Sequence, residues 1–141
     1  MNPSATFKSF HANAKLMITG EYLVLRGAKA LAIPLCYGQS LTVSERSGVP
    51  SIDWKTIING NHWFDAIFSP NELVIGNSND FPTAQNLREI FFAAKRLNPQ
   101  FLSEPVRYDV VSRLDFDINW GLGSSSSLIA NIAKWAEVDP F

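Results

Sequence analysis

A glycine- and serine-rich loop carries the clearest chemical signal in the sequence. Gly121–Ser127 reads Gly-Leu-Gly-Ser-Ser-Ser-Ser and lies between a predicted strand and a predicted helix. Glycines let a backbone approach a ligand closely, and the serines fall where the first N–H groups of a helix have no intrahelical partner. The helix dipole also favours an anion at this end. The pattern therefore predicts either a phosphate-binding cradle or a flexible turn followed by a serine-capped helix.

Three familiar loops with related composition are excluded. A P-loop requires a lysine after its glycine, and no lysine follows Gly123. The dinucleotide fingerprint requires a glycine where Ser126 stands, and the nucleophile elbow requires one where Ser127 stands. The two histidines, His11 and His62, are expected to be structural or to face solvent rather than to act in catalysis.

The segments before this loop are predicted to be mainly strands. Ile52–Ile58 and Phe64–Phe68 alternate apolar and polar residues around Asn59-Gly60, which is a strong hairpin signal. Further strand patterns, with a turn at Thr19–Glu21 and bends at Pro34 and Gly38, cover Thr6–Ala12, Lys15–Leu25, Ala30–Leu35 and Gln39–Ser44. Leu73–Asp80 is predicted to be a loop after Ile75.

Two helices complete the predicted layout. The first has Thr83 as its N-cap and ends at Asn98-Pro99. A strand over Val106–Asp115 follows, and the second helix comes after the serines and carries apolar residues as far as Ala136. Strands followed by a helix, a strand, the loop and a helix predict an α+β fold rather than regular βαβ alternation.

The composition sets the remaining limits. The chain has 141 residues, of which 46% are hydrophobic, and its formal net charge is −1, which fits one folded domain with a substantial core. A nearly neutral chain gives no electrostatic reason to expect nucleic acid or an anionic membrane as a partner. The single cysteine, Cys36, excludes an internal disulfide framework. No apolar stretch is long enough to span a bilayer and no signal peptide is recognised, so we expect a cytoplasmic protein.

Two segments of the sequence resemble motifs of the GHMP kinases, the superfamily that includes galactokinase, homoserine kinase, mevalonate kinase and phosphomevalonate kinase. Gly121–Ser125 resembles the central motif of that superfamily, and Ala14–Leu25 resembles its first motif. Gly20-Glu21-Tyr22 is most similar to the mevalonate and phosphomevalonate kinase branch. The sequence departs from the usual pattern at Asn13-Ala14, where Pro-Gly is common, and at Asp117, where proline is common.

The resemblance implies a ribosomal protein S5 domain 2-like fold for residues 1–141, as the N-terminal domain of such a kinase. Members of the superfamily are longer, and their catalytic aspartate and third glycine-rich motif lie in a C-terminal domain that this sequence does not include. We therefore expect a single, truncated nucleotide-phosphate-binding domain.

The same resemblance implies roles for individual residues. Lys15 would be catalytic, near the transferred phosphoryl group, and Glu21 would bind substrate or pair with Lys15. Ser125 would help to bind Mg²⁺, whose preferred ligands are oxygens. The phosphates of ATP would be held by Gly121, Leu122, Gly123, Ser124, Ser125, Ser126 and Ser127. Without the resemblance, Lys15 reads as an exposed strand residue and Glu21 as a solvated turn residue.

The function implied is ATP-dependent phosphoryl transfer to a small, mevalonate-like alcohol or phosphate by the full-length protein. Residues 1–141 would be inactive alone, because the general base is missing. The alternative is a non-catalytic remnant or a binding domain that associates with itself through the surface left by the missing domain, which would suit a chain with 10 Phe and 4 Trp residues.

Overall fold

The computed structural model describes residues 6–19, 27, 29 and 31–140. Its strands are β1 (Thr6–Thr19), β2 (Leu31–Arg46), β3 (Ser51–Ile58), β4 (Asn61–Phe68), β5 (Ile75–Ser78) and β6 (Arg107–Leu114). Its helices are α1 (Phe81–Leu97), α2 (Ser124–Ala136) and the short 3₁₀ helix η2 (Ile118–Trp120). The strands form one six-stranded sheet in the order β1-β2-β6-β3-β4-β5.

The sheet is mixed. Neighbouring strands are antiparallel except β3 and β6, which are parallel. The parallel pair requires a long crossover, and α1 lies on that connection between β5 and β6. The predicted hairpin is confirmed at β3 and β4, where Asn59 and Gly60 both have positive φ, 50° and 79°.

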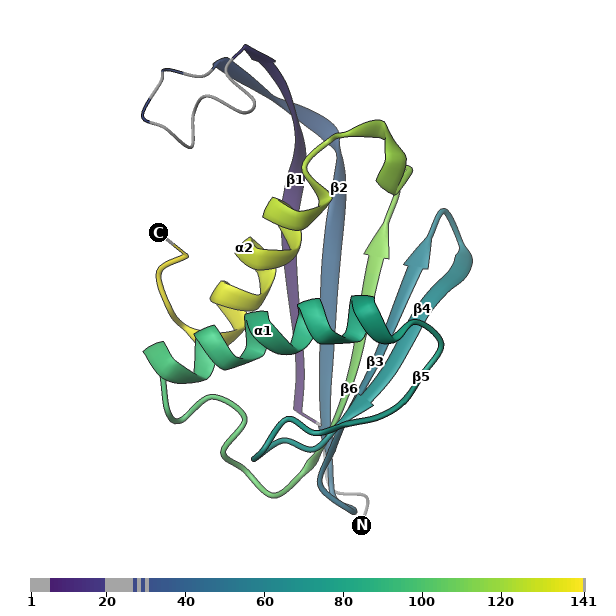
Figure 1. Cartoon of the computed structure of the whole chain (residues 1–141), viewed down its shortest axis with the longest axis vertical. Coiled ribbons are helices and arrows are strands. Elements are labelled where there is room, and N and C mark those ends of the chain that lie inside the picture. Colours follow the sequence, from purple (N-terminus) through teal and green to yellow (C-terminus); the bar gives the residue numbers. More distant parts are fainter. Residues whose placement is uncertain (1–5, 20–26, 28, 30, 141) are drawn as a thin grey trace.

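Both long helices cover the same face of the sheet (Figure 1). Helix α1 crosses the strands, and α2 contacts β1 and β2. Phe91 of α1 is fully buried. Its ring contacts four other aromatic side chains, which are Trp54, Phe68, Phe101 and Trp135. The core under the helices therefore fixes α2, the helix that follows the glycine-serine loop, to α1.

Strands β1 and β2 continue beyond the rest of the sheet as a two-stranded ribbon (Figure 1). The pairing of β2 with β6 runs from Gln39 to Arg46, whereas residues 31–34 of β2 pair with β1 alone. A small second core of Ala14, Leu114 and Phe116 lies where the ribbon leaves the sheet. The partly buried Leu122 packs against it, so this core ties the glycine-serine loop to β1 and β6.

Some local predictions were wrong. Helix α1 begins at Phe81 and its N-cap is Asp80, which accepts a hydrogen bond from the Thr83 N–H at 3.4 Å, so Thr83 is not the cap. Ile75–Ser78 is a short edge strand rather than loop, because it pairs with β4 despite its turn-forming residues. The segments predicted as separate strands on either side of Asn13 and of Pro34–Gly38 are continuous in β1 and β2, and the pairing of these strands shifts register between Gly38 and Pro34, where bends are predicted. The turn and extended segment predicted from Thr19 to Arg26 fall largely outside the described residues.

No helix in the ranges described is long and apolar enough to cross a bilayer.

Candidate functional site

The glycine-serine loop leads directly into helix α2 with no side-chain cap. Gly121 and Gly123 adopt left-handed backbone conformations, with φ of 69° and 78°. Gly123 is the N-cap, and no side-chain hydrogen bond caps the helix. The prediction of a serine-capped helix is therefore wrong, because the capping position is a glycine. The N–H groups of the first turn are left to a ligand or to water.

Lys15 of β1 reaches this loop, although the two lie near opposite ends of the sequence. The Lys15 N–H donates to the Leu122 carbonyl at 2.9 Å. The aliphatic stem of Lys15 runs against Gly123 so closely that a Cβ at that glycine would lie 3.0 Å from Lys15 Cγ and 3.2 Å from Cε. Glycine is thus favoured at position 123 for two reasons, its positive φ and the space that the lysine stem occupies.

Lys15 and the start of α2 line one polar cavity of about 270 Å³. Its lining residues are Lys15, Met17, Gly121, Gly123, Ser124, Ser125 and Ser126. Within the described residues, no hydrogen bond or ion pair engages the Lys15 ammonium group. A lysine ammonium group, the positive end of a helix and a row of hydroxyls are the features that bind a multiply charged anion.

Two of the loop residues predicted to bind phosphate, Leu122 and Ser127, do not line the polar cavity. Ser127 is 3% exposed, its N–H donates to the Gly123 carbonyl, and its hydroxyl lies 2.6 Å from Gln39 Oε1. The side chain of Leu122 packs into the second core, and its carbonyl accepts from Lys15. Neither residue lines the polar cavity, so this geometry does not support a direct phosphate contact for them. Glu21 lies outside the described residues.

A second cavity adjoins the first between the sheet and the two helices. It has a volume of about 280 Å³ and shares Ser124 and Ser125 with the polar cavity. Most of its wall is apolar or aromatic, and it includes Trp54, Trp63, Leu87, Ile90, Ile118 and Leu128, with the polar groups of Gln39, Thr83 and Asn86. Sequence reasoning missed this cavity. A local sign in the sequence is the adjacent pair Trp63-Phe64, which interrupts the alternation of β4.

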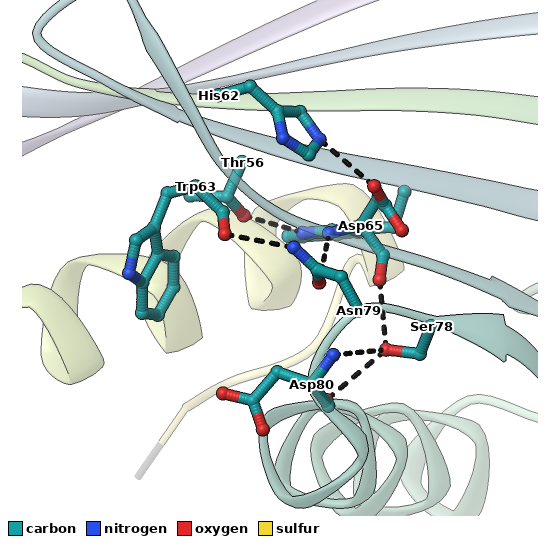
Figure 2. Close-up of polar contacts among 8 residues, drawn as sticks. Thr56, His62, Trp63, Asp65, Ser78, Asn79 and Asp80 are labelled. Atoms are coloured by element: carbon teal, nitrogen blue, oxygen red, sulfur yellow. Dashed lines mark hydrogen bonds and ion pairs between the residues drawn. The ribbon is translucent and has the colours of Figure 1, made fainter.

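The backbone around Trp63 is held by Asn79, which follows β5. Figure 2 shows the Asn79 side chain between Trp63 and Asp65. Asn79 Nδ2 donates to the Trp63 carbonyl at 3.1 Å, and Asn79 Oδ1 accepts from the Asp65 N–H at 3.0 Å. These two bonds supply hydrogen-bond partners to the backbone of β4 near the point where its pairing with β3 shifts register, between Thr56 and Ile57 of β3. These bonds hold the backbone of a residue whose side chain is partly exposed and lines the apolar cavity.

Asp115, Asp117 and both histidines have structural partners. Asp115 Oδ1 accepts from the Gly38 N–H at 2.6 Å, and Asp117 caps η2 by accepting from the Asn119 N–H at 2.8 Å. His11 contacts Asn13 at 3.0 Å and His62 contacts Asp65 at 3.1 Å. Among the residues described, no group of three or more His, Cys, Asp or Glu side chains is placed to hold a metal ion.

The comparisons with known proteins support the fold. No family model and no curated protein sequence matches this chain. A solved structure from Campylobacter jejuni described as a sugar kinase is similar over 97% of this chain and 43% of its own length, with 13% identity and a TM-score of 0.60. A phosphotransferase related to the CoA biosynthesis pathway aligns over 94% of this chain and 45% of its own, with 15% identity and a TM-score of 0.47. The chain spans less than half the length of both structures.

The predicted α+β fold is thus confirmed: its six-stranded mixed sheet and two helices match part of the structure described as a sugar kinase. At 13% identity this similarity is one of fold.

Proposed function

We propose that this chain is the nucleotide-phosphate-binding part of a GHMP-type small-molecule kinase, which transfers a phosphoryl group from ATP to a small alcohol or phosphate. The observation that carries the proposal is the contact between the Lys15 stem and Gly123. It joins the two segments that resemble kinase motifs into one polar cavity. The chain is also similar in fold to a structure described as a sugar kinase.

In this proposal the two adjoining cavities receive the two ends of ATP. The triphosphate lies in the polar cavity, with the N–H groups of Ser124–Ser126 and the Lys15 ammonium around its oxygens. The base and sugar lie in the apolar cavity beside Trp63 and Leu128. Ser124 and Ser125 line both cavities, so they would contact ATP where its phosphates join the sugar.

Lys15 has an electrostatic role in the proposed reaction. Phosphoryl transfer depends mainly on positioning and on stabilising the charge of the transferred group. Lys15, whose aliphatic stem runs against Gly123, would stabilise that charge and favour ionisation of an acceptor hydroxyl near it. We further propose that the acceptor is mevalonate-like and that Glu21 contacts it, which rests on the resemblance of Gly20-Glu21-Tyr22 alone. The general base is expected outside these residues, so the chain alone should not phosphorylate mevalonate.

Mg²⁺ fits the polar cavity through one residue of this chain. The exposed hydroxyl of Ser125 is a hard oxygen ligand, and Mg²⁺ in such sites takes most of its other ligands from phosphates and water. When bound, the ion would neutralise phosphate charge. The role of the Ser125 hydroxyl would be to hold the ion at the start of α2.

The Ser125→Ala variant tests this assignment. We expect it to weaken the binding of Mg·ATP by about five- to tenfold, the effect of one lost hydrogen bond or ligand contact, measured by calorimetric titration. Binding of ATP with the metal chelated should change little. The control is Ser9→Ala, which removes an exposed hydroxyl on β1 outside the cavity. Unchanged Mg·ATP binding, or an equal loss without the metal, would contradict a metal-binding role.

A self-associating domain remains the second candidate, and one observation favours it. Large apolar side chains are exposed on the β1–β2 ribbon and beside it: Leu16, Leu31, Ile33, Tyr37 and Trp120 are 41–55% exposed. If this surface pairs two copies, sedimentation equilibrium should show a dimer that Leu31→Glu with Ile33→Glu dissociates. A chain that stays monomeric at high concentration and binds Mg·ATP excludes this alternative.

A further inference from the structure

A buried polar cluster lies directly beneath the first turn of α2. Gln39 of β2 is 3% exposed; its Oε1 lies 2.6 Å from Ser127 Oγ, and its Nε2 lies 2.8 Å from Ser112 Oγ of β6. The Gln39 carbonyl also accepts from Asn131 Nδ2 at 2.9 Å. Ser112, Ser127 and Asn131 are all buried as well. One glutamine thus joins two strands to one helix.

The cluster attaches α2 at two points. Ser127 and Asn131 are four positions apart, so they lie on the same face of the helix, one turn above the other. Both contact the same residue, Gln39, which is paired with Ala12 of β1 and with Leu114 of β6. Two directional bonds to one strand position fix both the rotation of the helix and its height above the sheet.

The bonds to Gln39 hold the start of a helix that has no side-chain cap of its own. The start of most helices is fixed by a side-chain cap, but α2 begins at Gly123 with none. The loop before it contains two glycines with positive φ, which by themselves restrict the backbone weakly. On its N-terminal side the loop is held by the bond from the Lys15 N–H to the Leu122 carbonyl. On its C-terminal side Ser124–Ser126 are followed by Ser127, whose hydroxyl donates to Gln39 Oε1.

The free energy of burial alone does not explain why a glutamine, rather than an apolar residue, stands at position 39. Replacing a hydrogen-bonded buried polar group with an apolar group of similar shape is often nearly neutral for stability. What the side-chain amide adds is direction, since its Oε1 accepts from Ser127 Oγ while its Nε2 donates to Ser112 Oγ. Gln39 also lines the apolar cavity, next to Ser124 and Leu128.

We propose that Gln39 is a positioning residue for the phosphate site: acting through Ser127, it sets the first turn of α2 so that the N–H groups and hydroxyls of Ser124–Ser126 face the same cavity as Lys15. Its effect on binding rests on the proposed function. Its effect on the helix start does not, which allows the two to be tested separately.

The test compares Gln39→Met, Ser127→Ala and the double variant with wild type. Gln85→Met is the matched control, because Gln85 is exposed on α1 and lines neither cavity. The first measurement is amide hydrogen exchange, read at Ser127, whose N–H bonds to Gly123 O at 3.0 Å, and at amides of α1 as an internal reference. The second is the dissociation constant for Mg·ATP. Ser127→Ala is a small change that keeps the experiment informative if Gln39→Met folds poorly.

We expect exchange at the Ser127 amide to rise about five- to tenfold in each single variant, with α1 unchanged, and the affinity for Mg·ATP to fall by a similar factor. The double variant should be no worse than the poorer single variant, since both remove one interaction. Unchanged exchange at Ser127, or an equal rise across both helices, would overturn the proposal. So would unchanged Mg·ATP affinity in Gln39→Met when the wild type binds. If the wild type binds no Mg·ATP, the proposed function fails, and the exchange result still decides whether Gln39 positions the helix.

Discussion

Lys15→Met is expected to weaken Mg·ATP binding by about 10- to 100-fold, the usual effect of losing a charge-assisted hydrogen bond to a phosphate. Methionine keeps an unbranched side chain, so packing against Gly123 is retained while the ammonium group is lost. The backbone bond from residue 15 to the Leu122 carbonyl also remains. The loss should therefore appear in calorimetric titration without a change in the melting temperature.

The control for this experiment is Lys8→Met. Lys8 is an exposed lysine on the same strand, and it does not line the polar cavity. The Lys8→Met substitution removes one positive charge, as Lys15→Met does, so it measures any general electrostatic contribution to ATP binding. If Lys15→Met and Lys8→Met bind Mg·ATP equally well, Lys15 does not contact the phosphates and the assignment fails.

Phe91→Ala is expected to lower the free energy of unfolding by about 3–5 kcal/mol, the range for large-to-small aromatic substitutions in a core. Phe91 is 0% exposed and makes ring contacts with four aromatic residues from the sheet, from the segment after α1 and from α2. Phe91 contacts Trp135 of α2 edge-on, with 6.2 Å between ring centres. The space left by the lost phenyl ring would therefore also loosen the packing of α2. Urea unfolding followed by tryptophan fluorescence gives the measurement.

Phe81→Ala provides the comparison for Phe91. Phe81 begins the same helix but is 54% exposed, so its removal should cost no more than about 0.5 kcal/mol. Similar losses for the two variants would contradict the account of the core, in which burial of Phe91 joins the helices to the sheet.

The sequence predicted those parts of the fold that local physics determines. The β3–β4 hairpin follows from Asn59-Gly60 and its flanking alternation, because both turn residues accept positive φ. The helix after the serines follows from apolar spacing, and the α+β class follows from the order of the elements. The pairing of Lys15 with the glycine-serine loop was implied by the resemblance, since no local pattern relates residues so far apart in sequence.

The missed features depend on contacts between distant segments. Ile75–Ser78 has turn-forming residues and becomes a strand only through its pairing with β4. Ser127 cannot be distinguished from its neighbours by sequence, yet its position faces Gln39 of β2 and is buried. The apolar cavity is assembled from the sheet, α1, η2 and α2, so no single segment predicts it.

We propose that the start of α2 and Lys15 together bind the phosphates of ATP. Amide chemical-shift mapping by NMR during a titration with Mg·ATP would locate the bound nucleotide. We predict saturable shifts at Lys15 and at Gly123–Ser126, with smaller shifts around Trp63 and Leu128, and no shift at Arg113, which lines neither cavity. Saturable binding that leaves Lys15 and Gly123–Ser126 unshifted, or no binding at all, would contradict the account.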